Sequence, residues 1–118
     1  MKRRGQDIGE EGEDRLGALA EALASLGDAQ ACAAFLEDLC TPAELEAITD
    51  RWRVVPLLQQ GVPYREIHDL TQVSVTTIGR VARTLERGTG GYALALEAAA
   101  RRAVRAGRGV GARRKAAR

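Results

Sequence analysis

Aromatic residues are scarce in this chain. Only 3% of its 118 residues are Phe, Trp or Tyr, so a folded core depends mainly on Leu, Val, Ile and Ala side chains. The length allows one small domain with tails rather than two domains. A small helical chain of this composition buries little surface by itself, which favours a second copy of the chain as a partner.

Cysteine and histidine are nearly absent. His68 lies far in sequence from the two cysteines, Cys32 and Cys40, and neither a CxxC pair nor a Cys/His cluster occurs. This spacing argues against a zinc site and indicates two reduced thiols packed in a helical core. We expect no metal and no cofactor. With one histidine, no paired carboxylates in a pocket-like setting and no Gly-rich phosphate loop, an enzyme is the weakest function class.

Long apolar runs are also missing. No stretch approaches the roughly 20 residues that cross a bilayer, and the start, MKRRGQDIGEEGED, lacks the apolar segment of a signal peptide. We therefore expect no membrane partner and a cytoplasmic location.

Charge is balanced overall but not along the chain. The net charge is +2, yet residues 7–14 hold five acids, whereas residues 101–118 hold seven arginines, one lysine and no acid. A basic end favours a polyanionic partner, most simply nucleic acid. The alternative is an ordinary solvated charge run.

Apolar spacing predicts an all-α protein of about six helices. The Gly-rich, charged residues 1–12 are predicted to be mobile, and residues 106–118, without an apolar period, are predicted to form a disordered basic tail. Residues 13–105 then form the helical domain. The predicted helices span residues 13–26, 29–39, 42–60, 64–70, 74–87 and 92–105.

The third predicted helix carries the clearest local signals. Thr41 and Glu44 match a capping box, with Pro42 in the first helical position, and Gly61 is suited to a left-handed stop. Pro56 deletes a helical hydrogen bond and clashes with the carbonyl of Trp52, at about 3 kcal/mol or more. We expect a kink at residues 52–56, or a break there.

Residues 64–85 read as two short helices joined by a tight turn. Ile78, Val81 and Leu85 have helical spacing, while Thr71–Ser74 interrupts the period. The second helix leaves Thr76, Thr77, Arg80 and Arg83 free, as a helix that enters the major groove of DNA requires. The pattern predicts a helix-turn-helix.

The stretches FLEDLCTPAELEAITDRWRVVPLLQQG and YREIHDLTQVSVTTIGRVARTLERGTGGYALAL together resemble the Trp-repressor-like family, and in particular its YerC/YecD-type branch. The resemblance covers residues 29–96. It implies an all-helical, intertwined homodimer that binds double-stranded DNA, and a transcriptional regulator, a repressor, associated with the nucleoid.

The same resemblance implies where a tryptophan corepressor would bind. The matching positions include Val81, which stands where the repressor has glycine beside the indole ring, so its branched side chain fills that space. The resemblance therefore implies a vestigial pocket and a DNA binder that does not use tryptophan as its effector, while another small-molecule effector stays an open alternative. The polar residues of this pocket are Thr41, Arg51, Arg80 and Thr84, beside Thr77.

Nine residues are candidates for DNA contact. The first turn of a recognition helix faces base edges, and Ser74 with the free N–H groups there suits a phosphate. Arg65 and His68 are added by the resemblance. The set is Arg65, His68, Ser74, Val75, Thr76, Thr77, Gly79, Arg80 and Arg83.

Three alternatives stay open. Arg80 and Arg83 pair with Glu86 or Glu66 on a solvated face in the plainest interpretation. A low-specificity, nucleoid-type protein that coats DNA with its basic tail is a second alternative. The third is a protein-interaction module whose basic face is incidental.

The turn between the two short helices departs from the usual pattern. Gln72 occupies a position that usually holds a glycine with positive φ, and a residue with a side chain there costs about 1–2 kcal/mol.

Overall fold

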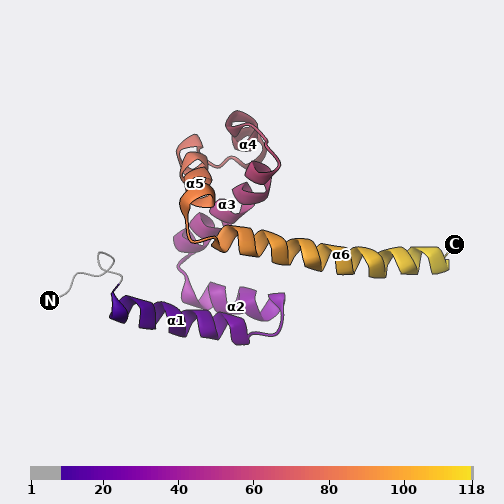
Figure 1. Cartoon of the computed structure of the whole chain (residues 1–118), viewed down its shortest axis with the longest axis horizontal. Helices are drawn as coiled ribbons and strands as arrows, with labels where there is room; N and C mark the ends of the chain where they lie inside the picture. The colour runs from indigo at the N-terminus through magenta and orange to yellow at the C-terminus, as the bar shows by residue number, and fades with distance from the viewer. Residues whose placement is uncertain (1–8, 118) are drawn as a thin grey trace. The chain divides into compact units, whose positions relative to one another are not determined.

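The chain folds into α-helices throughout the part that the structure describes. The computed structural model describes the backbone of residues 9–117 and the side chains of residues 9–107. Of the mobile segment predicted for residues 1–12, residues 1–8 lie outside this range, and the chain is helical from Glu10 onward. The all-α class and the number of six helices are confirmed for the described residues: α1 (Glu10–Ser25), α2 (Ala29–Leu39), α3 (Pro42–Gln59), α4 (Tyr64–Thr71), α5 (Val75–Arg87) and α6 (Gly91–Ala117) (Figure 1). The chain divides after Leu45 into two units.

Helices α1 and α2 belong to the first unit. α1 begins at Glu10, three residues before the predicted Glu13, because Glu10, Glu11 and Glu13 place negative charge at the positive end of the helix dipole. Leu26 is already extended. Asp28 caps α2 as predicted, and its carboxylate accepts from the N–H of Ala31 at 2.8 Å.

Neither α1 nor α2 buries a residue in the single chain. Their apolar stripe is nevertheless present, and Leu16 remains 62% exposed. Most helical stability in proteins comes from packing an apolar face rather than from helix propensity. These two helices therefore present an apolar face that the chain itself does not bury.

The capping box at the start of α3 is confirmed. The Thr41 N–H donates to Oε1 of Glu44 at 2.8 Å, and the Glu44 N–H donates to Oγ1 of Thr41 at 3.1 Å. The hydrogen bond from the Thr41 backbone, followed by that of its side chain, holds the pKa of the Glu44 carboxyl below its ordinary value. The carboxylate form thus stabilises the helix start.

Pro56 does not break α3. The helix continues through it to Gln59, and Gly61 then adopts φ +81°, the predicted left-handed stop. The break offered as one outcome is therefore wrong, and the kink remains a prediction. Val54 and Val55, directly before the proline, are fully buried, and burying such side chains yields about 1.5–3 kcal/mol each, enough to offset the proline.

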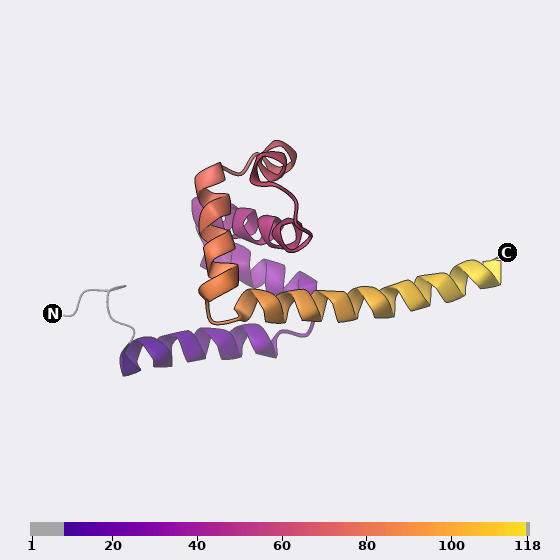
Figure 2. The ribbon, with the colours of Figure 1, turned by 45° about the horizontal axis from the view of Figure 1, so that its top comes forward.

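The core of the second unit joins α3, α4 and α5. Leu57, Leu58, Val62, Leu85, Tyr92 and Leu96 pack around it, so the beginning of α6 also takes part. Figure 2 shows α5 running from the turn after α4 to the start of α6. The buried apolar residues are Val54, Val55, Ile67, Val73, Ile78 and Val81.

Helix α6 is longer than predicted. It starts at Gly91, after Gly90 with φ +91°, and continues to Ala117, past the predicted end at Arg105. The expectation of a disordered segment from residue 106 is thus wrong for residues 106–117. Alanine and arginine are among the strongest helix formers, and they outweigh the intervening glycines. Within unit two, α6 extends away from α3–α5 (Figures 1 and 2), and Leu94 is 66% exposed.

Candidate nucleic-acid interface

A left-handed residue makes the turn between α4 and α5. Gln72 has φ 64° and ψ 11°, as its position in the turn predicts. Its N–H donates to the carbonyl of His68 at 2.7 Å, and its side-chain amide donates to the carbonyl of Asp69 at 3.1 Å. These bonds offset the cost of positive φ in a residue with a side chain.

Side-chain hydrogen bonds that the sequence did not predict hold this turn in place. The buried Thr71 hydroxyl donates to the carbonyl of Ile67 at 2.7 Å and accepts from the N–H of Val73 at 3.1 Å. Nδ1 of His68 lies 2.8 Å from the carbonyl oxygen of Val73. Polar residues in the last turn of α4 were the only sequence signal for these bonds.

Ser74 caps α5, as predicted. Its hydroxyl accepts from the N–H of Thr77 at 3.1 Å and donates to Oγ1 of Thr77 at 3.0 Å. The first N–H groups of a helix have no intrahelical partner, so those of Val75 and Thr76 point out of the N-terminus. This end of α5 can accept a phosphate oxygen or face base edges.

Helix α5 has two distinct sides. Ile78 is fully buried and Val81 is 1% exposed, so both belong to the core. None of the nine DNA candidates is buried: Arg65, Ser74, Val75, Thr76, Arg80 and Arg83 are exposed, and His68, Thr77 and Gly79 are half-buried. The candidates all lie on α4, on α5 or at the cap between them, so the turn brings them into one region.

Acidic neighbours do not pair with Arg80 or Arg83 of α5. In the described part of the chain, neither Arg80 nor Arg83 forms an ion pair, whereas Arg53 pairs with Asp50 at 3.6 Å. The interpretation in which these arginines pair with Glu86 or Glu66 therefore has no support here. Their guanidinium groups are available to an outside anion.

The residues of the predicted vestigial pocket have different local surroundings, and the pocket stays a prediction. Thr41 caps α3 in the first unit, and Arg51 is half-buried on α3. Thr84 donates to the carbonyl of Arg80 at 3.1 Å. The Val81 side chain is buried in the core, so it occupies space that a glycine would leave open.

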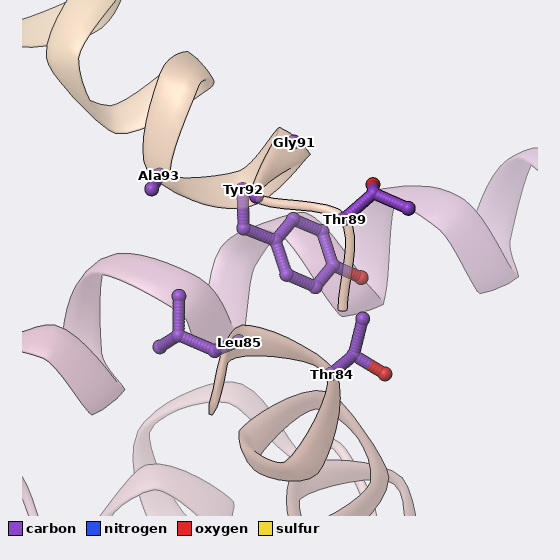
Figure 3. A pocket seen from close by; sticks show the side chains of 7 residues that line it. Thr84, Leu85, Thr89, Gly91, Tyr92 and Ala93 are labelled. Atoms are coloured by element: carbon purple, nitrogen blue, oxygen red, sulfur yellow. The ribbon is translucent and has the colours of Figure 1, made fainter. Parts of the chain in front are cut away.

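A hollow does lie between the end of α5 and the start of α6. Its volume is about 250 Å³, below the roughly 300–1,000 Å³ of typical ligand pockets. In Figure 3 the Tyr92 ring lies over Leu85 and Thr84. Of the four pocket residues expected from the sequence, only Thr84 lines it. The full lining is Thr84, Leu85, Thr89, Gly90, Gly91, Tyr92 and Ala93.

Comparison with known proteins identifies the family. The family model described as Trp repressor protein matches residues 14–100, most of the chain. The chain belongs to the Trp repressor family. Family membership confirms the resemblance seen in the sequence and indicates a helix-turn-helix DNA-binding regulator rather than an enzyme.

Two relatives support this membership of the Trp repressor family. "Uncharacterized protein YerC" of Bacillus subtilis is 37% identical over 79 residues, which are 67% of this chain and 76% of that protein. The crystal structure of a "putative Trp repressor" from Staphylococcus aureus matches with a TM-score of 0.69 and 30% identity, over 79% of this chain and 93% of that one. In the described residues, no helix is both long and apolar enough to span a membrane.

Proposed function

We propose that this chain is a sequence-specific transcription regulator, a repressor, that binds double-stranded DNA through α4 and α5. One observation carries the proposal: α5 buries Ile78 and Val81 and leaves Thr76, Arg80 and Arg83 exposed beside a capped, outward-facing N-terminus. Hydroxyl and guanidinium groups at the start of a recognition helix suit base edges and phosphates.

The proposal assigns a role to each candidate. Val75, Thr76 and Gly79 face the bases, with Val75 suited to a thymine methyl group. Ser74, Thr77 and the helix N-terminus lie near a phosphate, and Arg80 and Arg83 reach bases or phosphates. Arg65 approaches the DNA from α4, and His68 lies on the same helix, next to the turn.

The working form is a homodimer. Helices α1 and α2 bury no residue in the single chain, and Leu16 and Leu19 remain exposed. Trp52 is 38% exposed on α3, unusual for a large aromatic side chain unless a partner covers it. A second copy covers these faces in an intertwined arrangement. Sedimentation equilibrium tests this, because a monomer at micromolar concentration contradicts the proposal.

Tryptophan is not the effector in this proposal. The Val81 side chain is 1% exposed and packs in the core, which leaves no room for an indole ring at that position. Adding tryptophan at saturating concentration is expected to leave operator affinity unchanged. A rise in affinity with tryptophan contradicts this part of the proposal.

Affinity for DNA of defined sequence tests the function as a whole. Genome-wide mapping of bound sites supplies the operator, and its affinity is then compared with random DNA at physiological salt. A ratio of about 10³ or more is expected for a specific regulator. A ratio near one supports the nucleoid-type coating protein instead, and absence of binding supports a protein-interaction module.

A further inference from the structure

We propose that His68 is a positioning residue, which holds the turn of the helix-turn-helix through Nδ1 and thereby sets how α5 is presented. This inference rests on the proposed function and assigns His68 a role inside the protein rather than on the DNA. Its basis is the 2.8 Å separation between Nδ1 and the carbonyl oxygen of Val73.

The chemistry of this contact fixes the position of a proton. A carbonyl oxygen only accepts hydrogen bonds, so Nδ1 of His68 carries the hydrogen and donates it. In the neutral ring, Nε2 is then left as an acceptor. An acceptor does not bind a phosphate oxygen, and the neutral imidazole is therefore suited to the turn and not to the DNA backbone.

Val73 is the residue through which this bond acts. Its side chain is 4% exposed and belongs to the core, and its N–H donates to the Thr71 hydroxyl. The His68 bond therefore holds the other polar backbone group of Val73, its carbonyl. Val73 directly precedes Ser74, the cap of α5, so holding the peptide groups on both sides of its Cα atom fixes the direction in which α5 starts.

The left-handed conformation of Gln72 explains why the hydrogen bond from His68 to Val73 matters. A residue with a side chain at φ 64° is held there by its surroundings and not by its own preference. His68 lies at one end of the turn and Val73 at the other, and their bond closes the loop across Gln72. Without it, the turn relies on the bonds made by Thr71 and Gln72.

Two substitutions separate the two ring nitrogens. In His68→Asn the side-chain amide N–H lies near the former Nδ1 and still donates to Val73, while in His68→Gln the amide lies near the former Nε2. We expect His68→Asn to keep operator affinity within about twofold. We expect His68→Gln and His68→Ala to lower it about fivefold, the loss of one net hydrogen bond.

The salt dependence of binding distinguishes a positioning residue from a phosphate contact. A bond inside the protein releases no counterion, so His68→Ala should keep the log–log salt slope. Arg65→Ala, an exposed residue of the same helix, is the matched control, and each lost phosphate contact lowers the slope by about 0.9. A flatter slope in His68→Ala, or retained affinity in His68→Gln with loss in His68→Asn, overturns the proposal.

A measurement without DNA keeps this inference separate from the proposed function. Nitrogen-15 NMR of the full-length free protein should place the hydrogen of the neutral His68 ring on Nδ1. The carbonyl carbon shift of Val73 should change in His68→Ala and His68→Gln and stay close to wild type in His68→Asn. A hydrogen on Nε2, or an unchanged Val73 shift in all three variants, overturns the proposal even if the protein binds no DNA.

Discussion

The ring of Tyr64 lies beside Gly79, across the angle between α4 and α5. A Cβ atom added to Gly79 would stand 3.9 Å from Cε2 of Tyr64, an ordinary van der Waals contact. The protein therefore has room for alanine at this position, although glycine in a helix interior costs about 0.5–1 kcal/mol relative to alanine. The fold does not explain this glycine, whereas the proposed function does, because it brings the DNA close to Gly79.

Gly79→Ala is expected to raise the free energy of unfolding by about 0.5–1 kcal/mol and to lower operator affinity about tenfold. The added methyl group strengthens the helix and holds the groove face of α5 away from the bases. Chemical denaturation and fluorescence anisotropy measure the two effects. Gly17→Ala, in α1 with no atom within 4 Å of the added Cβ, is the control and should raise stability alone.

Two valines of α5 should respond in opposite ways to the same substitution. Val81 is buried, and Val81→Ala should lower the free energy of unfolding by about 2 kcal/mol. Val75 is 51% exposed, and Val75→Ala should leave stability nearly unchanged while it weakens operator binding. Equal losses of stability in the two variants would contradict the two-sided description of the helix.

The cap of α3 should make stability depend on acid. Because folding lowers the pKa of Glu44 from its ordinary 4.5, its contribution is fully present above that value and is lost as pH falls through the lowered pKa. Thermal unfolding from neutral pH to about pH 3 should show a smaller acid loss in Glu44→Gln than in wild type. Glu46→Gln removes a carboxylate of the same helix without touching the cap, and should lose stability as wild type does.

Deleting residues 106–118 should weaken binding to all DNA sequences alike. The deleted stretch holds Arg108, Arg113, Arg114, Lys115 and Arg118, and each phosphate that it neutralises contributes about 0.9 to the log–log salt slope. The shortened protein should show a flatter slope and an unchanged ratio of specific to random affinity. An unchanged slope would show that this segment is a solvated charge run.

Local sequence rules predicted the helix starts and stops well. The caps at Asp28, Thr41 and Ser74 and the left-handed Gly61 follow from side chains that bond their own backbone neighbours, so a short window of sequence suffices. The start of α1 and the end of α6 were predicted wrongly. There the sequence gives several weak preferences and no cap, and acidic or alanine-rich stretches extended the helices further than the apolar pattern indicates.

Local sequence rules could not predict the contacts across the turn between α4 and α5. The bond from His68 to Val73 and the approach of Tyr64 to Gly79 depend on the angle between α4 and α5, which no local pattern encodes. The apolar spacing predicted that Val81 faces inward, and the family resemblance explained why that matters. Which of the nine candidates touch DNA remains a prediction, because only a complex decides it.

The buried apolar residues of the described chain all lie between Val54 and Val81. Contacts between residues so close in sequence form quickly, because little chain entropy is lost in bringing them together. The helix-turn-helix is therefore expected to fold early, on a single chain. Helices α1 and α2 bury no residue in the single chain, and in the proposed homodimer they are covered only when a second chain binds. The final step of folding is then expected to be an encounter between two molecules, with a rate that rises with protein concentration.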